Sequence, residues 1–304
     1  MARTAPLLWL DGAMIPSADA SVPLMAHAPQ RGSLVFDVGS FHRTARGVAL
    51  FRVREHVVRF LSSARIVGLE IAASEDALVE AAALVTRAAK AEEGLIRWSA
   101  FFDAATPDLL PRSAKARVAV AAQIPEDPPR TSPMRIAIFD DARKAAPDAL
   151  SPEAKAAAAY LGPMIARRRA VARGDDDVVL LDHEGNVAEA PIANIFFVHR
   201  GVLRTPALGK ILPGITRDAV LAIAKAEGVP TREERISVAE ALAADEAFLT
   251  ATSFPVAPIG TVNGTALAGA PGPITKRLQD RLVRAQRGED AAFAAWCTTV
   301  ARDA

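Results

Sequence analysis

The segment from Leu212 to Asp218 reads Leu-Pro-Gly-Ile-Thr-Arg-Asp and constrains the local fold more than any other part of this chain. Gly214 allows a tight turn, and apolar residues then recur at helical spacing. We therefore predict a helix N-terminus at the amides of Ile215 and Thr216. Such amides and the positive end of the helix dipole favour an anion, and a threonine hydroxyl adds a donor. The pattern is typical of a phosphate seat, although a simple turn followed by a helix cap would share it.

Four motifs make the chain similar to a known family. They are Trp9-Leu10-Asp11-Gly12, the run from Phe51 to Arg59, the segment Leu212–Asp218, and Gly272-Pro273-Ile274-Thr275-Lys276-Arg277. On these motifs the chain resembles the class IV aminotransferases, the fold-type IV pyridoxal-phosphate enzymes that include branched-chain and D-amino acid aminotransferases. The branched-chain group is the nearest in pattern. The resemblance implies a two-domain α+β fold, with a small α/β domain and a larger domain that has a β-barrel-like core.

The composition is that of an ordinary globular protein. Of the 304 residues, 51% are hydrophobic and 23% are charged, which excludes a disordered chain. The net charge of +1 argues against nucleic-acid binding, and we interpret Arg167–Arg169 as a solvated helix face. No apolar run approaches the ~20 residues that span a bilayer, and we see no signal segment. Cys297 is the only cysteine, so we expect no internal disulfide and no thiolate metal cluster, and a reducing compartment fits. We expect no metal in the site and a cytoplasmic location.

Prolines mark the boundary between two predicted domains. Pro125, Pro128 and Pro129 lie in one short stretch, where fixed φ angles and missing amide protons oppose a regular element. We expect a small α/β domain at residues 1–124, an interdomain linker at 125–133 and a large cofactor-binding domain at 134–304.

Hydrophobic periodicity predicts the elements on both sides of this linker. Asp11-Gly12 is a hairpin signal between strands at Leu7–Leu10 and Ala13–Ile15. Further strands are predicted at Val48–Val53, Leu95–Phe102, Ala116–Gln123, Arg135–Phe139, Val178–Leu181, Ile195–Val198 and Ala247–Thr250. Helices are predicted at Arg54–Leu69, Glu75–Ala91, Tyr160–Arg173, Asp218–Glu227 and Val238–Ala243.

The resemblance implies that Lys155 attaches pyridoxal 5′-phosphate. Lys155 matches the family's Schiff-base lysine by its spacing to Tyr160 and to the strand at Val179–Asp182. An unprotonated amine at this position would form the imine and then move a proton at the substrate's α carbon. Without the resemblance, the ordinary interpretation is a solvated lysine at a helix start. Lys144 and Lys210 are the nearest rivals, but neither has the tyrosine spacing.

The resemblance also implies contacts to the cofactor's ring. Tyr160, the only tyrosine, would bond the phenolic oxygen. Glu189 would keep the pyridine nitrogen protonated, which makes the ring an electron sink. The residues alone also allow a packed tyrosine with its hydroxyl in water and a solvated glutamate in a turn.

For the phosphate, the resemblance implies a cradle with four contributors. The guanidinium of Arg59 suits phosphate oxygens, and Ile215, Thr216 and Thr252 would add amides and hydroxyls. Outside this context, Arg59 could form a surface ion pair with Glu55, and Thr252 could simply cap a strand end.

The chain departs from the family pattern mainly on the substrate side. After the acid, the family's Glu-Gly-x-Gly-Glu-Asn is replaced by Glu189-Ala190-Pro191-Ile192-Ala193-Asn194, and proline changes the available backbone path. Arg31 replaces the tyrosine of the branched-chain His-Tyr-Gly, and Val35-Phe36-Asp37-Val38 replaces Val-Phe-Glu-Gly. Substrate identity is therefore less constrained than the cofactor.

Two arginines are candidates for a second substrate carboxylate. Arg31 and Arg97 together could hold an acidic substrate such as glutamate, although Arg31 could instead face solvent or pair with Asp37. Phe36 and Trp98 could line an apolar pocket or belong to the core. The candidate substrate residues are Arg31, Phe36, Arg97 and Ser253.

The sequence thus predicts a homodimeric cytoplasmic aminotransferase that moves an amino group from an amino acid or amine to a 2-oxo acid. Two alternatives stay open. One is a lyase resembling aminodeoxychorismate lyase, with the same lysine used for elimination. The other is a pyridoxal-phosphate-binding protein with little catalysis, against which the intact Lys155, Tyr160 and Glu189 argue. The sequence does not choose among L-amino acids, D-amino acids and primary amines.

Overall fold

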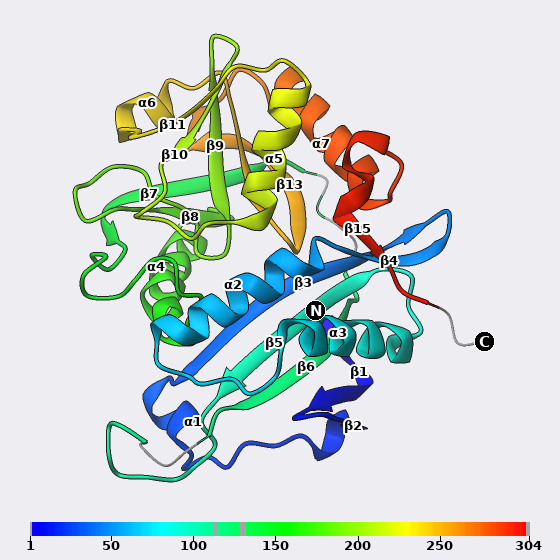
Figure 1. The fold of residues 1–304 in the computed structure, drawn as a ribbon. Coiled ribbons are helices and arrows are strands. Elements are labelled where there is room, and N and C mark those ends of the chain that lie inside the picture. The colour runs from blue at the N-terminus through cyan, green and yellow to red at the C-terminus, as the bar shows by residue number, and fades with distance from the viewer. Residues whose placement is uncertain (1, 112–114, 128–129, 131, 302–304) are drawn as a thin grey trace. The chain divides into compact units, whose positions relative to one another are not determined.

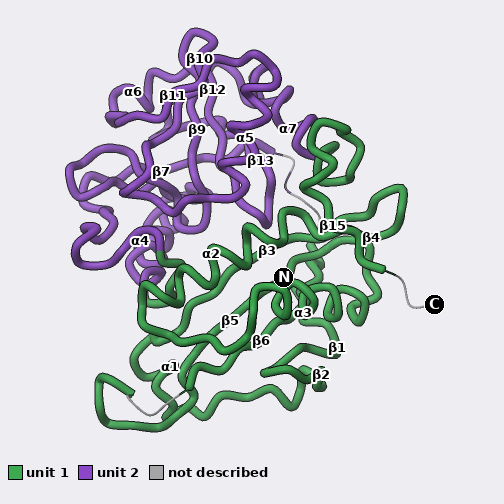
Figure 2. The backbone as a smooth tube through the Cα atoms, viewed as in Figure 1, with its two compact units in different colours: residues 1–128, 154–158, 284–304 green, residues 129–153, 159–283 purple. Residues whose placement is uncertain are grey.

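The computed structural model describes residues 2–127, except 112–114, together with residue 130 and residues 132–301. Contacts divide the chain into two units, coloured separately in Figure 2. Unit 1 comprises residues 1–128, 154–158 and 284–304, and unit 2 comprises residues 129–153 and 159–283. A short segment around Lys155 therefore belongs to unit 1, although the chain on both sides of it belongs to unit 2. Of the predicted linker, residues 128, 129 and 131 lie outside the described part.

Unit 1 is built on a seven-stranded sheet whose neighbouring strands are all antiparallel. The strand order is β15-β4-β3-β5-β6-β1-β2. The strands are β1 (Ala2–Leu10), β2 (Ala13–Pro16), β3 (Leu34–Thr44), β4 (Gly47–Phe51), β5 (Gly94–Phe101), β6 (Arg117–Pro125) and β15 (Cys297–Thr299). The predicted hairpin between β1 and β2 is confirmed, because Asp11 and Gly12 both take positive φ angles, of 48° and 104°.

Two helices of unit 1 cover one face of this sheet, as Figure 1 shows. They are α2 (Val53–Ile66) and α3 (Glu75–Ala89), and α1 (His27–Arg31) is a shorter helix. Helix α2 buries Phe60 and helix α3 buries Leu78, both fully, in a core that contains Trp98. Each side chain of this size stabilises the unit by roughly 1.5–3 kcal/mol.

Unit 2 contains a mixed sheet of eight strands. Seven follow the order β11-β10-β9-β12-β13-β7-β8, and β14 pairs with β13. The strands are β7 (Met134–Arg143), β8 (Asp177–Leu181), β9 (Asn194–His199), β10 (Val202–Pro206), β11 (Thr231–Glu234), β12 (Glu246–Ala251), β13 (Phe254–Val262) and β14 (Thr265–Ala266). The two-sheet, mixed α/β architecture agrees with the fold class expected from the sequence.

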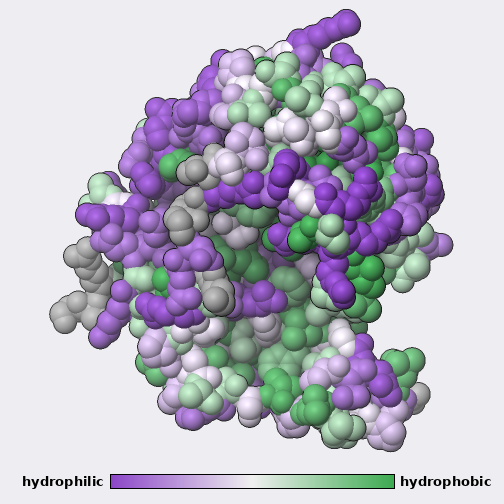
Figure 3. All heavy atoms as spheres, turned by 180° about the vertical axis from the view of Figure 1, so that it is seen from behind, coloured by the Kyte–Doolittle hydropathy of each residue, from purple (hydrophilic) through white to green (hydrophobic). Residues whose placement is uncertain are grey.

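Helices complete the second half of the chain. They are α4 (Leu161–Ala172), α5 (Ile215–Ala226), α6 (Val238–Leu242) and α7 (Pro273–Gln286), with a 3₁₀ turn at Ala157–Tyr160. Ser237 caps α6 in a reciprocal capping box with Glu240. Within the described ranges, no helix is long and apolar enough to cross a bilayer. Hydrophilic residues cover much of the face that Figure 3 shows.

Several element boundaries differ from the sequence-based expectation. The strand predicted at Val48–Val53 ends at Phe51, because Arg52 takes a left-handed φ of 50° and α2 begins at the next residue. Helix α5 begins at Ile215, which confirms the N-terminus predicted from the Leu212–Asp218 motif and lies three residues before the start at Asp218 that periodicity indicated. Strands β3 and β13 and helix α7 were not predicted.

Candidate functional site

Lys155 lies in extended backbone beside strand β3, within unit 1. Its N–H donates to Ser63 Oγ at 3.0 Å, and its carbonyl accepts the amide of Phe36 at 3.0 Å. The next residue, Ala156, forms an isolated β-bridge with Val35. The lysine is partly buried and precedes the 3₁₀ turn, so it is not a fully solvated residue on a helix.

The side chain of Lys155 shares an aromatic neighbour with Arg97. The Lys155 Nζ lies 5.1 Å from the centroid of the Phe36 ring, and the guanidinium carbon of Arg97 lies 4.1 Å from it. Both distances are within the range of cation–π attraction. Phe36 is 8% exposed, whereas Trp98 is fully buried and donates its indole N–H to the carbonyl of Leu78, so Trp98 belongs to the core. The structure thus brings together Lys155, Phe36 and Arg97.

Arg31 does not join this group. It lies on α1, is exposed to solvent, and donates to the carbonyl of Gln30 at 3.2 Å. The alternative pairing of Arg31 with Asp37 is not formed, because the fully buried Asp37 bonds other partners. Of the interpretations left open for Arg31, exposure to solvent is the one that unit 1 shows.

Arg59, the predicted phosphate ligand, rests on a buried carboxylate. Its Nε and Nη2 donate to the two oxygens of Asp37 at 2.7 and 2.9 Å, and His56 Nδ1 lies 2.7 Å from Asp37 Oδ1. The surface interpretation of Arg59 is therefore wrong, because its side chain is 11% exposed and pairs with a buried carboxylate. Glu55 instead accepts from Arg52 at 2.8 Å. The Arg59 fork is held from the side by two parallel bonds, an arrangement that fixes its plane.

Burial and charge set the protonation of this cluster. Desolvation opposes the charge on Asp37, but Arg59 and the hydrogen bonds from His56 outweigh it and hold the pKa of that carboxyl well below its usual range. Burial lowers the pKa of His56, although Asp37 works in the opposite direction. The His56 ring also stacks on Trp98, with ring centroids 6.3 Å apart. The cluster is therefore an ion pair supported by a neutral histidine at pH 7.

In unit 2, Glu189 is a buried carboxylate surrounded by donors. It is 8% exposed, so the solvated-turn interpretation is wrong. One oxygen is paired with the Lys144 amine, the other accepts the amide of Asn194 at 3.0 Å, and both accept the N–H of Leu212 at 3.1–3.2 Å. Its backbone carbonyl accepts from Leu180 of β8 at 2.9 Å. Three separate segments thus converge on this acid.

Asn194 connects Glu189 to the predicted phosphate seat. Its Nδ2 also donates to the carbonyl of Leu212 at 3.0 Å, and its Oδ1 lies against Gly214. A Cβ added to Gly214 would overlap that oxygen. Gly214 has φ −70° and ψ 129°, which any residue can adopt. The expectation that the turn needs the conformational freedom of glycine is therefore wrong. The glycine is required by space.

Helix α5 begins directly after this glycine. Its first residue is Ile215, its second is the buried Thr216, and the N–H of Asp218 closes the first turn on the Gly214 carbonyl at 2.9 Å. The positive dipole end of a helix N-terminus fits a phosphate group. The third predicted phosphate contact, Thr252, is partly buried in the two-residue turn between β12 and β13, and Ser253 beside it is exposed.

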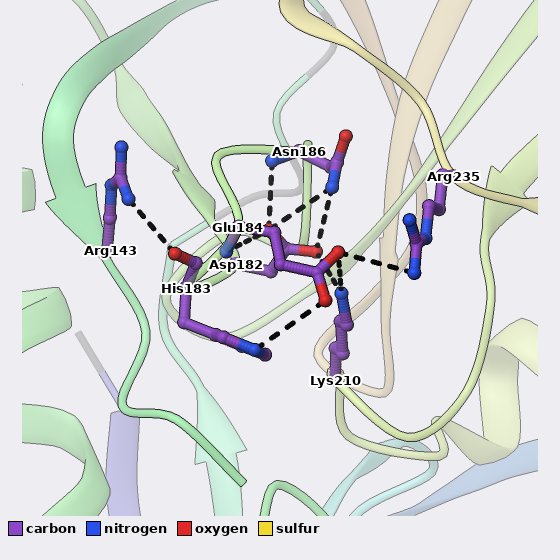
Figure 4. Close-up of polar contacts among 7 residues, drawn as sticks. All are labelled: Arg143, Asp182, His183, Glu184, Asn186, Lys210 and Arg235. Atoms are coloured by element: carbon purple, nitrogen blue, oxygen red, sulfur yellow. Dashed lines mark hydrogen bonds and ion pairs between the residues drawn. The ribbon is translucent and has the colours of Figure 1, made fainter.

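A network of charged side chains supports the segments that reach Glu189 (Figure 4). Lys210 bonds Asp182 at 3.0 Å and Glu184 at 2.6 Å, and it lies two residues before Leu212. Desolvation lowers the pKa of Lys210, but its bonds to these carboxylates outweigh that effect and raise it. Lys210 is therefore held as a cation, which disfavours it as a nucleophile.

The same network anchors the segment that carries Lys144. Arg143 donates to the carbonyl of His183 at 3.0 Å, and Asp182 accepts the backbone N–H groups of Glu184 and Asn186 at 2.9 Å. The turn at 182–186 thus contacts both of the segments whose residues Lys144 and Leu212 bond Glu189. Arg143 connects the segment at 143–144 to this turn through the His183 carbonyl, and Lys210 connects the segment at 210–212 to it through carboxylates of opposite charge.

Four residues of these clusters were not identified from the sequence as site residues. Asp37 and His56 support Arg59, and Lys144 and Asn194 support Glu189. Two signals were available. Asp37 interrupts an apolar strand, where a charge requires a partner. His56 and Arg59 also lie three residues apart on one helix, so they share a face.

Comparison with known proteins agrees with this arrangement. The family model for amino-transferase class IV matches residues 35–262. A branched-chain-amino-acid aminotransferase of Pseudomonas aeruginosa is 32% identical over 306 residues, with 99% of each chain covered. Solved structures of branched-chain aminotransferases from Thermoproteus uzoniensis, with norvaline, and from T.th., with pyridoxamine 5′-phosphate, each have a TM-score of 0.93. Their identities are 33% and 32%, and the matches cover 98% of this chain and 100% and 99% of theirs.

The fold and the family match define a pyridoxal-phosphate-dependent transaminase of fold type IV. The chain belongs to the class IV aminotransferase family, and its relatives over nearly the full length are branched-chain aminotransferases.

Proposed function

We propose that the chain transfers amino groups between an α-amino acid and a 2-oxo acid, with pyridoxal 5′-phosphate attached at Lys155. When bound, the cofactor supplies an aldehyde that accepts the amino group and a ring that withdraws electrons from the substrate's α carbon. The cofactor-binding residues of this proposal are Arg59, Lys155, Tyr160, Glu189, Ile215, Thr216 and Thr252. The donor chemistry fits: a cation and a helix N-terminus suit the phosphate, and a carboxylate suits the ring nitrogen.

The observation that carries this proposal is the buried Glu189 with its converging donors. A carboxylate fixed in this way can hold a proton on the cofactor's ring nitrogen, which is the charge that the chemistry requires. The Lys155 amine would take up and return the proton at the substrate's α carbon. Tyr160 would donate to the phenolic oxygen.

The rival lysines are engaged in structural pairs. The Lys144 amine is paired with Glu189, and the Lys210 amine is bonded to Asp182 and Glu184. Lys155 instead lies over the face of Phe36, and two main-chain bonds fix its segment against unit 1. The lysine that matches the family motif is thus also held in a defined place.

Borohydride reduction followed by peptide mass spectrometry tests the attachment. Cofactor mass is expected on the peptide that contains Lys155 in the wild-type enzyme, and Lys155→Ala should lose both the label and the turnover. Lys144→Ala and Lys210→Ala are the matched controls and should keep the label. A label on either of those lysines in the wild-type enzyme would overturn the assignment. Turnover that needs no 2-oxo acid would indicate the lyase alternative.

For the substrate, we infer a branched-chain or similar aliphatic amino acid, with a dicarboxylic acid as the second substrate. The relatives are named for branched-chain amino acids, and the match to them covers nearly the whole chain. Arg97, stacked on Phe36, is the cation best placed within unit 1 to bind a second carboxylate. Arg31 and Ser253 are exposed and are the weaker substrate candidates.

Paired kinetics on glutamate and leucine test the substrate side. Arg97→Leu is expected to raise the KM for glutamate more than that for leucine. The change Arg31→Tyr restores the branched-chain pattern and is expected to favour leucine over glutamate if Arg31 contacts substrate. Equal effects on both substrates would place the substituted arginine outside the pocket.

We also infer that two copies of the chain associate, and that the enzyme works in the cytoplasm. Helix α4 exposes Leu161, Met164 and Ile165, which are 62%, 52% and 52% exposed. Neighbouring exposed apolar side chains of this kind are typical of an interface. Light scattering coupled to size exclusion should give twice the chain mass, and Ile165→Lys should reduce it.

A further inference from the structure

We propose that Asn194 is a positioning residue that fixes the distance between the acid Glu189 and the turn at Leu212–Thr216. One ligand would then have its ring nitrogen and its phosphate bound at a set separation. The inference rests on the roles proposed above for Glu189 and Thr216. It concerns a residue that bonds Glu189 and the Leu212 carbonyl and that is itself placed at neither end of the cofactor.

Asn194 uses both hydrogens of its amide nitrogen in this connection. The side chain is 5% exposed and stands at the start of β9, where its backbone pairs with Thr250 of β12. The two hydrogens of Nδ2 have two acceptors, Glu189 Oε2 and the Leu212 carbonyl, each at 3.0 Å. The opposite amide orientation would place an oxygen against both acceptors, so the contacts themselves determine which atom is nitrogen.

A direct bond closes the network. The N–H of Leu212 donates to Glu189 at 3.1–3.2 Å, so Glu189, Asn194 and Leu212 form a ring of three hydrogen-bonded residues. Such a ring resists a change in any one separation more than a single bond does. A ligand that is bound at both ends gains affinity when the two ends are held in advance at the right distance.

The contact with Gly214 adds a steric link to the same turn. Because a Cβ at Gly214 would overlap Asn194 Oδ1, any larger residue at position 214 would force the asparagine side chain or the turn to shift. The position of Asn194 therefore constrains the backbone of residue 214, which directly precedes the amide of Ile215.

Binding of three ligands to cofactor-stripped protein tests the proposal: pyridoxine 5′-phosphate, pyridoxine and inorganic phosphate. None of them has an aldehyde, so attachment to lysine does not contribute. For Asn194→Ala we expect the affinity for pyridoxine 5′-phosphate to fall about tenfold, as the loss of two buried hydrogen bonds predicts. The affinities for pyridoxine and for phosphate should each change much less. Asn194→Asp, which is isosteric but lacks the donor, should show the same selectivity.

Each other outcome has a defined meaning. An equal loss for phosphate would show that Asn194 only supports the turn, and an equal loss for pyridoxine would show that it acts only through Glu189. Either result, or no loss at all, would overturn the proposal. Asn263→Ala is the matched control, because that amide bonds the Ile138 backbone elsewhere in unit 2 and should leave all three affinities unchanged.

The roles of Glu189 and Thr216 are tested separately in the same assay. Glu189→Gln and Thr216→Ala should each lower the affinity for pyridoxine 5′-phosphate. If neither does, the proposed function of these residues fails independently of Asn194.

A second measurement uses the steric link. Gly214→Ala should strongly lower the affinity for pyridoxine 5′-phosphate in the wild-type background. The loss should be much smaller in the Asn194→Ala background, where the clashing oxygen is gone. Additive losses would contradict the geometry on which the proposal stands.

Discussion

The two units hold a buried carboxylate in opposite ways. In unit 1, Asp37 forms two parallel bonds with one guanidinium, that of Arg59, and a third contact with His56. In unit 2, Glu189 is contacted by Lys144, Asn194 and the N–H of Leu212, which come from three separate segments. In the proposed function, the first carboxylate supports the cation that binds the phosphate, whereas the second itself contacts the cofactor's ring nitrogen. Loss of one partner should therefore break the first cluster but only loosen the second.

The largest expected effect is the loss of Asp37. Asp37→Ala leaves the Arg59 guanidinium largely buried without its carboxylate, and we expect the free energy of unfolding to fall by about 3–5 kcal/mol. Urea denaturation measures it. Asp141→Ala removes the partner of Arg169 from an exposed pair and should cost less than about 1 kcal/mol. A similar small loss for both variants would contradict the contrast between the clusters.

His42, on the same strand as Asp37, sharpens the comparison because burial there favours the neutral form. Burial, aided by Arg287, lowers the pKa of His42 from 6.5 to about 4. Above pH 6.5 the folded and unfolded forms are both neutral at this residue. As the pH falls from 6.5 to 4, only the unfolded chain takes up the proton, so stability decreases.

This decrease should reach about 3 kcal/mol by pH 4 and should not continue below it. His42→Gln is expected to remove this decrease in stability between pH 6.5 and 4, while the pH dependence that other groups cause remains. Chemical denaturation at half-unit pH steps measures it. Parallel wild-type and variant curves between pH 6.5 and 4 would show that His42 titrates normally in the folded protein.

The affinity for the cofactor compares the two units through their proposed contacts to its phosphate group. Arg59→Ala in unit 1 and Thr216→Ala in unit 2 each remove a donor proposed for the phosphate, and each should weaken pyridoxal phosphate binding by roughly 1–3 kcal/mol. Turnover at saturating cofactor should change much less. Equilibrium titration of stripped enzyme provides the affinities. If both variants bind the cofactor as the wild type does, the phosphate cradle has been assigned to the wrong residues.

The smallest expected effect is the loss of Lys144. In Lys144→Met, Glu189 keeps its bonds to Asn194 and Leu212, so we expect stability to fall by only about 1 kcal/mol. Thermal unfolding next to Asp37→Ala gives the direct comparison. A loss as large as that of Asp37→Ala would mean that Glu189 depends on one partner after all.

Much of the fold follows from local sequence, and the exceptions have physical causes. The hairpin at Asp11-Gly12 was predictable because these residues tolerate positive φ angles. Strand β3 was not predicted, because Asp37 and Gly39 disfavour a strand when read alone. The buried partners of Asp37 come from helix α2, so they become evident only in three dimensions.

The candidate site divides in the same way. Family spacing pointed to Lys155, Glu189 and Thr216 as functional positions, since their place in a motif is visible in sequence. The support of Glu189 by Lys144 and Asn194 was not visible, because it depends on segments that meet only in the folded unit. The reason for glycine at position 214 was likewise misjudged. The space that a side chain at this position would fill is occupied by Asn194, a residue 20 positions earlier in the chain.

The docking of the Lys155 segment onto unit 1 also has a consequence for the order of folding during synthesis. The segment binds β3 and the Ser63 hydroxyl, both of which leave the ribosome well before residue 155. Six of the seven strands of that sheet are complete by residue 125, and only the edge strand β15 comes later. Because domains fold as they emerge, Lys155 meets a nearly finished surface, whereas Glu189 must wait for the later Asn194 and Leu212.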